Sequence, residues 1–167
     1  PELLMTDSNG ETQSVVDVDK RFFYGNSPGG ILGTSYLALT PFVQRGVLGV
    51  SGAPYSLLLP RSIDFTAYFM IFKTMYPDYL EITLWLGLLQ TLWDSGGPSG
   101  YLDSIRKQPI EGNSPKDVLI QAAIGDAQVT TLGAHIQARG IGAGLLANPV
   151  RPIWGIEELE DGVQGTG

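Results

Sequence analysis

The sequence predicts a mixed α/β fold in which parallel strands are flanked by helices. A short aromatic run from Arg21 to Tyr24 ends abruptly at glycine, serine and proline, which is typical of a buried strand. Apolar residues recur at helical spacing from Pro28 onward, and a second apolar run covers Val43 to Val50. Strand, tight turn, helix and strand form a βαβ unit, which requires parallel strands and a right-handed crossover.

The remaining core elements follow from the same two periodicities. Pro28 suits the first position of the helix, and Pro41 stops it. Residues 118–124 form a third apolar run, which predicts a strand, and a helix is expected from about Thr130 to Leu146. The first twenty residues are polar and rich in turn-forming types, so we expect a loop there.

Between residues 61 and 108 the pattern changes to apolar, aromatic helices, predicted at 62–76, 77–93 and 99–107. We interpret this segment as a helical cap inserted between two strands. The predicted organisation is therefore a core made of residues 1–60 and 115–147, a helical cap or lid at 61–114, and an acidic tail at 148–167.

Composition excludes several functional classes. The 167-residue chain has a net charge of −7 and no run of Lys or Arg, so it lacks the positive surface that nucleic acids require. It has no cysteine, which excludes disulfides, cysteine-ligated zinc and a thiol nucleophile, and we predict no cofactor and no metal site. Its most apolar stretch, Ile82 to Trp93, is shorter than the ~20 residues of a transmembrane helix. Nothing in the sequence indicates a cellular compartment.

One short motif points to chemistry. The segment Gly25-Asn26-Ser27-Pro28-Gly29 fits the pattern G-x-S-x-G, and it lies between the predicted aromatic strand and the predicted helix. A nucleophilic serine at such a turn must hold a strained backbone, and glycine neighbours tolerate the crowding. Ser27 is therefore a candidate nucleophile. The alternative is a tight strand-to-helix turn in which Ser27 only caps the helix, as serine commonly does.

This motif and its surroundings resemble bacterial α/β-hydrolases of the lipase and esterase kind, over about residues 17 to 146. The resemblance rests on residues 23–31, with 45–50 as the next strand. It implies a partial α/β-hydrolase fold, a serine nucleophile, an acid after a later strand, a histidine base after the last strand, and carboxylic esters as substrates. It further implies that the chain is the C-terminal part of this fold, with the upstream strands and the histidine loop outside it.

Two residues are candidates for the rest of a catalytic triad. Asp126 follows the third predicted strand, as the acid does in the family that the chain resembles; its alternative role is a helix cap. Asp64 and Asp94, beside the cap helices, are rival acids. His135 is the only histidine, but it lies within a predicted helix, so either it reaches Ser27 from that helix or the base lies outside the chain.

Pro28 argues against efficient hydrolysis. The residue after the nucleophile should donate its N–H to the oxyanion, and proline has none. Losing one such donor costs roughly 10²- to 10³-fold in turnover. We also expect Pro28 to push Ser27 toward extended backbone angles, away from the left-handed region. The alternatives to an esterase are a non-catalytic hydrolase-like binding domain and an inactive fragment.

The resemblance and the composition also predict partners. An apolar pocket for a small ester would be lined by aromatic side chains of the cap, although aromatic residues at helical spacing are more often core: Phe65, Tyr68, Phe69, Phe72, Trp85 and Trp93. A sheet of only three strands would expose an edge beside the strand that ends at Ser27. That edge invites pairing with the remainder of the same fold or with a second copy.

Overall fold

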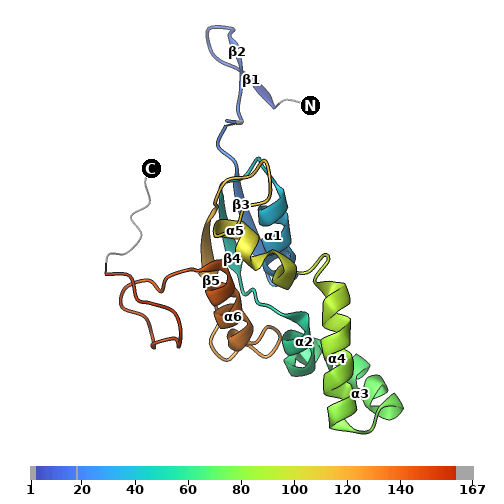
Figure 1. Cartoon of the computed structure of the whole chain (residues 1–167). Coiled ribbons are helices and arrows are strands. Elements are labelled where there is room, and N and C mark those ends of the chain that lie inside the picture. Colours follow the sequence, from blue (N-terminus) through green and yellow to red (C-terminus); the bar gives the residue numbers. More distant parts are fainter. Residues whose placement is uncertain (1–2, 18, 161–167) are drawn as a thin grey trace.

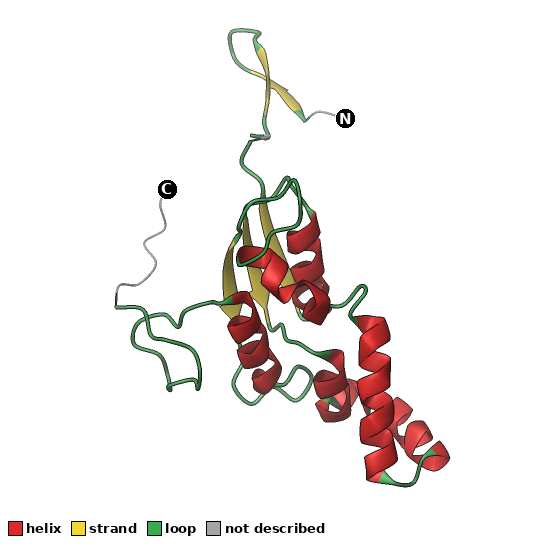
Figure 2. Ribbon diagram, viewed as in Figure 1, coloured by secondary structure: helices red, strands yellow, loops and turns green. Residues whose placement is uncertain are grey.

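The computed structural model describes residues 3–17 and 19–160. It shows a three-stranded parallel sheet with helices packed on one face, and a projecting helical hairpin (Figures 1 and 2). The strands are β1 (Leu4–Thr6), β2 (Thr12–Ser14), β3 (Phe22–Asn26), β4 (Arg45–Gly49) and β5 (Asp117–Gln121). The α-helices are α1 (Pro28–Leu39), α2 (Tyr55–Leu58), α3 (Thr66–Met75), α4 (Tyr79–Trp93), α5 (Leu102–Arg106) and α6 (Thr131–Ile141). Short 3₁₀ helices are η1 (Leu59–Arg61), η2 (Ile63–Phe65) and η3 (Pro98–Tyr101).

The mixed α/β class with a parallel sheet is confirmed. The strand order is β3-β4-β5, so β4 is central, and both pairings are parallel. Because parallel strands point the same way, Asn26, Gly49 and Gln121 share one register row at the carboxyl edge. The loops that follow the three strands therefore start from that edge.

One face of the sheet is covered and the other is open. On the covered face, the core joins Leu37 of α1, Leu48 of β4, Ile105 of α5 and Ile141 of α6, with partly buried side chains of β3 and β5 around them. The elements η3 and α5 lie within the segment 61–114, yet they belong to this helical layer. The projecting part of that segment is the pair α3 and α4 (Figure 1).

Three segments illustrate how the structure differs from the prediction. Residues 4–14 were expected to be loop, but β1 and β2 pair antiparallel; the Asp7 carboxylate accepts the N–H groups of Asn9 and Glu11 in the connecting turn. β5 stops at Gln121 rather than residue 124. α6 ends at Ile141 rather than Leu146 because Gly142 takes a left-handed conformation (φ 80°) and closes the helix.

No helix in the described part of the chain is both long enough and apolar enough to cross a membrane. The longest, α4, has 15 residues.

Candidate active site

Ser27 sits at the sharp turn between β3 and α1, and its backbone is strained. Its φ is 54° and its ψ is −122°, a combination rare for any residue other than glycine. Its N–H donates to Gly49 O at 2.9 Å, and its carbonyl accepts from Gly30 and Ile31, also at 2.9 Å. The expectation that Pro28 would hold Ser27 extended is therefore wrong, because hydrogen bonds on both sides fix the turn.

The Ser27 side chain does not cap the helix. Ser27 occupies the N-cap position of α1, but its hydroxyl accepts no hydrogen bond from the first turn. The residue is half-buried. Pro28 is the first helical residue, as its missing N–H favours. The Ser27 hydroxyl is thus not engaged in holding the helix end, and it remains available for other chemistry.

Two of the three glycines in the turn lie so close to neighbouring backbone that a side chain would not fit. The third has open space around it. A Cβ on Gly25 would overlap the carbonyl of Gly29, and a Cβ on Gly30 would lie 2.5 Å from Gly49 O. A Cβ on Gly29 would meet nothing within 4 Å. The turn therefore requires glycine at positions 25 and 30, so Gly30 takes the packing role that the motif suggested for Gly29.

The residues after β4 add a second strained position that the sequence did not reveal. Val50 has a φ of 47°, unusual for a β-branched residue, and its N–H donates to Gln121 O at 2.8 Å. Ser51 is buried, and its Oγ has no hydrogen-bond partner in the described residues. Strained non-glycine residues thus end two neighbouring strands at one edge of the sheet. Strain of this kind clusters at functional sites.

Asp126 lies in the loop after β5, starting from the same edge as Ser27. One carboxylate oxygen, Oδ1, accepts the N–H groups of Gln128 (2.7 Å) and Val129 (2.9 Å). Because α6 starts only at Thr131, Asp126 caps this local turn and not the helix. The turn fixes the position of the carboxylate.

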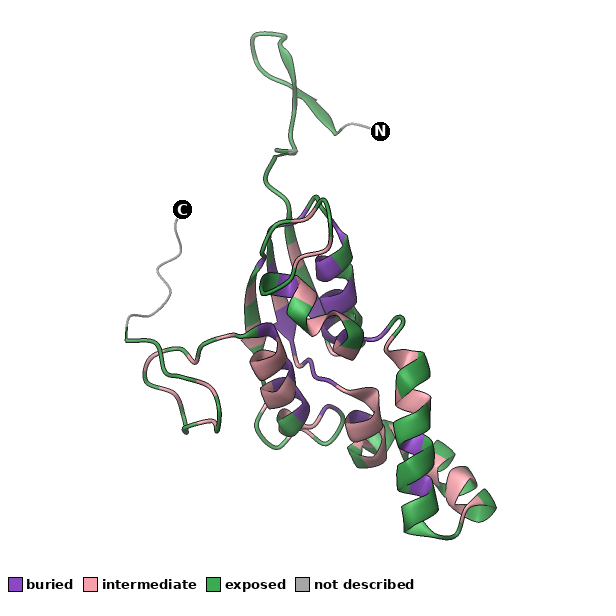
Figure 3. Ribbon diagram, viewed as in Figure 1, coloured by how far each residue is buried: buried purple, intermediate pink, exposed green. Residues whose placement is uncertain are grey.

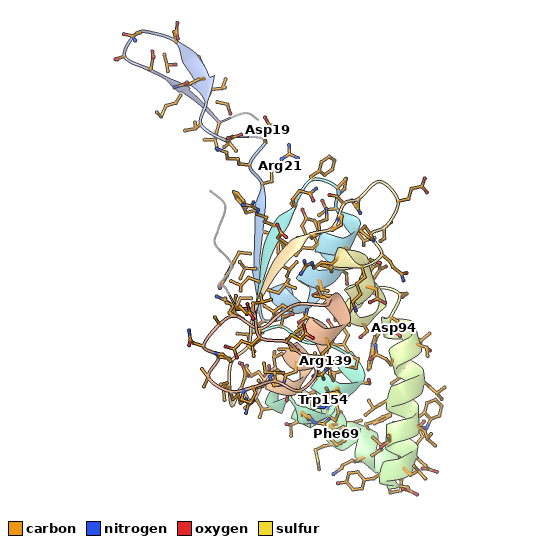
Figure 4. All side chains as sticks on the ribbon, turned by 60° about the vertical axis from the view of Figure 1, so that its left-hand side comes forward. Asp19, Arg21, Phe69, Asp94, Arg139 and Trp154 are labelled. Carbon is orange, nitrogen blue, oxygen red and sulfur yellow. The ribbon has the colours of Figure 1, made fainter. Side chains whose placement is uncertain are left out.

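The rival acids are also engaged locally. Both carboxylate oxygens of Asp64 accept from the Gln128 amide, at 3.2 and 3.1 Å, and Ile63 N–H donates to Ala127 O. These bonds attach the Asp126 loop to η2. Asp94, at the end of α4, accepts from the Gln90 amide at 2.6 Å (labelled in Figure 4).

His135 is half-buried on α6. Burial lowers its pKa, and the nearby charges of Arg151 and Arg139 lower it further, which favours the neutral imidazole. Arg139, one turn along the same face, donates to Trp154 O at 2.9 Å and lies over the Trp154 ring (Figure 4). Gln137, on another face of α6, donates to Thr34 of α1 at 2.5 Å. Within the described residues, no hydrogen bond joins His135 to Ser27 or Asp126.

Two cavities lie beside the hairpin rather than at Ser27. The smaller, about 170 Å³, is walled by α3 and α4 and includes Phe65, Tyr68, Phe72 and Trp93 of the aromatic set singled out from the sequence. The larger, about 760 Å³, lies between the α2–η1 segment and the hairpin and includes Phe69. Neither cavity is lined by Ser27, Asp126 or His135. No group of three or more His, Asp or Glu side chains in the described residues could hold a metal ion.

Comparison of the chain with protein-family models, curated proteins and solved structures finds no match.

Proposed function

We propose that this chain carries the nucleophile and the acid of a serine hydrolase that cleaves carboxylic esters, on a partial α/β-hydrolase fold with the α3–α4 hairpin as its cap. The observation that carries the proposal is Ser27. It combines a strained backbone at φ 54° with a hydroxyl that leaves the helix end uncapped. A serine used only as a cap would accept a backbone N–H of the first helical turn. Because the strained backbone at Ser27 does not serve to cap the helix, it supports a functional role for this residue.

The proposed reaction is acyl transfer in two steps. Ser27 Oγ attacks the ester carbonyl carbon while its proton passes to a base, and the tetrahedral intermediate expels the alcohol, which takes that proton. Water, deprotonated by the same base, then attacks the acyl-serine. The C–O bond to Ser27 breaks, Ser27 Oγ takes the proton back from the base, and the carboxylic acid is released. Asp126 would orient the base and stabilise its charged form.

The base has two candidates, His135 and a histidine outside this chain. His135 is the candidate within the chain, and its lowered pKa favours the neutral imidazole that a general base needs. Its face of α6 carries Arg139 and the Trp154 contact, whereas α6 bonds to α1 through Gln137. Assignment of His135 as base therefore stays a prediction, beside a histidine outside this chain.

Oxyanion binding is expected to be weaker than in an enzyme with two full donors. Pro28 has no N–H, so Gly29 is the first residue after Ser27 that has one, and it lies in the first turn of α1. Loss of one donor costs roughly 10²- to 10³-fold in turnover. We accordingly propose a slow esterase, with a small apolar ester as substrate, because both cavities beside the cap are walled mainly by apolar side chains.

Labelling with a fluorophosphonate probe tests the nucleophile. We expect one covalent adduct, located on Ser27 by peptide mass spectrometry and absent from Ser27→Ala. The matched control is Ser51→Ala, because Ser51 is the buried serine at the same sheet edge and should not be labelled. Equal labelling of the intact protein and Ser27→Ala would refute the proposal.

Pro28 supports a second candidate, a non-catalytic domain that binds an apolar ligand. The two candidates separate when Pro28 is replaced by Gln, which restores an N–H after Ser27. A hydrolase should gain turnover of p-nitrophenyl butyrate, by up to roughly 10²-fold. A binding domain should show no turnover before or after the change.

A further inference from the structure

Two arginines form a positive cluster beside the only histidine of a chain whose net charge is −7. Arg139 and His135 lie four residues apart on α6, so they share one face of the helix. Arg151 follows in the segment after α6. Besides burial, the charges of Arg151 and Arg139 lower the pKa of His135, which places both guanidinium groups near the imidazole. Like charges repel, so bringing them together costs free energy.

The segment after α6 folds back onto the helix and carries Arg151 with it. Leu145 makes two backbone hydrogen bonds of 2.8 Å with residues 157–159, which closes the intervening chain into a loop. Arg139 donates to Trp154 O at 2.9 Å, and its guanidinium lies 5.5 Å from the centre of the Trp154 ring (Figure 4). The loop that carries Arg151 is therefore held against the Arg139 face of α6. Figure 3 shows that this loop is largely exposed.

No acidic side chain among the described residues neutralises this cluster. Neither Arg139 nor Arg151 forms an ion pair there, and the ion pairs that are present involve other basic residues: Lys20, Arg45 and Lys107. Of the acids in the folded-back segment, Glu158 accepts the N–H of Asn148 at 3.0 Å, and Glu157 forms no ion pair. Within the described part of the chain, the two positive charges therefore lack a counterion.

The unused donors of the two arginines suit an oxyanion. Arg139 uses only one of its N–H groups on Trp154 O, and Arg151 makes no hydrogen bond within the described residues. A guanidinium presents its donors as a rigid fork that matches two oxygens of a phosphate or a carboxylate. Arg151 is exposed and Arg139 is half-buried, so a ligand in solution can reach both. Two positive charges are neutralised by a phosphate dianion, whereas a carboxylate neutralises only one.

We propose that Arg139, Arg151 and His135 form a binding site for the phosphate group of a small soluble molecule. The phosphate supplies the missing counterion, because it pairs with both guanidinium groups and favours protonation of the imidazole, which then donates as well. Trp154 is 86% exposed beside Arg139, so its ring provides an apolar surface for the rest of the molecule. This site goes beyond the proposed esterase activity, because it does not involve Ser27.

NMR of the intact chain tests the proposal, because a single histidine gives a single imidazole signal to follow. Inorganic phosphate is the probe, and we expect a saturable shift of the His135 signal at low millimolar concentration. Sulfate, which stays dianionic, should raise the midpoint of the His135 titration by about one pH unit, because a bound anion favours the imidazolium. The indole N–H of Trp154 should shift with the same concentration dependence, whereas that of Trp93 in the hairpin should not.

Variants of Arg151 separate binding from a general effect of charge. Without added anion, Arg151→Gln should raise the midpoint of the His135 titration, because a positive neighbour is lost, and it should abolish the saturable shift. Arg151→Lys keeps the charge but lacks the fork, so it should weaken phosphate binding several-fold. The matched control is Arg21→Gln, since Arg21 is an exposed arginine far from Arg139 in Figure 4, and it should bind like the parent chain. Circular dichroism checks that each variant is folded.

Three results would overturn the proposal. The first is sodium chloride raising the midpoint as much as sulfate at equal ionic strength, which would indicate screening alone. The second is equal phosphate binding by the parent chain and Arg151→Gln. The third is binding to phosphatidic acid vesicles without binding to inorganic phosphate, which would indicate a lipid surface. Ser27→Ala should bind phosphate like the parent chain, so this proposal and the esterase proposal can fail separately.

Discussion

At the scale of single residues, Ser27 and Val50 are the two strained positions at the carboxyl edge of the sheet. Each residue that follows a strand donates its N–H to the last residue of the neighbouring strand: Ser27 to Gly49, and Val50 to Gln121. The sheet edge therefore holds these two residues at positive φ against their own preference. Strain of this kind costs on the order of 1–3 kcal/mol per residue and persists only where its surroundings enforce it.

The strain at Ser27 predicts a trade-off between stability and labelling. Ser27→Gly should raise the free energy of unfolding by about 1 kcal/mol, because glycine adopts positive φ without steric cost, and it should abolish fluorophosphonate labelling. Urea denaturation of both proteins measures the first effect. Ser27→Ala is the control, since alanine keeps the strain and removes only the hydroxyl. A loss of stability in Ser27→Gly would contradict this account of the turn.

Lys116 is a buried cation at the opposite edge of the sheet. Its ammonium donates at 2.8 Å to the carbonyl of Thr40, the C-cap residue that follows α1, and it forms no ion pair within the described residues. Burial lowers its pKa. Keeping Lys116 charged in the folded state therefore lowers the free energy of unfolding at pH values below its folded-state pKa. That cost disappears as pH rises from the folded-state pKa to the unfolded value.

We therefore predict that the free energy of unfolding gains a contribution from Lys116 as pH rises toward 10.5, the ordinary lysine pKa. The slope of unfolding free energy against pH should be less positive in Lys116→Met, because methionine fills similar space without titrating. Lys20→Met is the matched control, since Lys20 is an exposed lysine, and its slope should follow that of the parent chain. Parallel curves for Lys116→Met and the parent would show that burial does not perturb Lys116.

At the scale of elements, the β3–α1 turn distinguishes two kinds of glycine. Gly30→Ala should lower the free energy of unfolding by about 1–3 kcal/mol, because its methyl group would meet the Gly49 carbonyl, which belongs to backbone and cannot move aside. Gly29→Ala should raise it by up to about 1 kcal/mol, because the methyl group meets open space and alanine favours the helix. Thermal unfolding of the pair measures both. Equal effects at the two positions would refute the packing difference.

The sequence predicted best those helices and strands whose apolar residues recur regularly and whose ends are marked by proline or glycine. The aromatic run before Gly25, the helix from Pro28 and the strand from Arg45 all appear, because proline and glycine punctuate them. The β1–β2 hairpin was missed because its strands have three residues each and are fully exposed, so no burial pattern marks them. α6 ends just before Gly142, earlier than expected, because the predicted helix contains four glycines and the sequence does not distinguish which of them ends it.

Sequence reasoning could place the candidate site only in part. It located Ser27 and Asp126 after strands that do share an edge, since parallel topology determines this. It could not foresee the positive φ of Val50 or the engagement of Asp126 in a local turn, because both depend on contacts between segments distant in sequence. Nor could periodicity distinguish helices that cover the sheet, η3 and α5, from those that project from it.

At the scale of the whole molecule, burial is unevenly distributed. The covered face of the sheet joins α1, α5 and α6 around Leu48, while the opposite face leaves Phe22, Tyr24 and Leu119 exposed. The α3–α4 hairpin meets the body mainly at α2, through the hydrogen bond from Ser56 N–H to Gln90 and the edge-on ring contact between Tyr55 and Trp93. α3 itself contains no buried residue. The molecule thus combines a compact body with a hairpin that depends little on it.

This distribution predicts the order in which the chain opens. Amide hydrogens of β4, the central strand, should exchange slowest, because they are released only when the core around Leu48 unfolds. Those of α3 should exchange faster by several orders of magnitude, through local opening. Hydrogen–deuterium exchange with mass spectrometry measures both in one experiment. Slower exchange in α3 than in β4 would contradict the separation of hairpin and body.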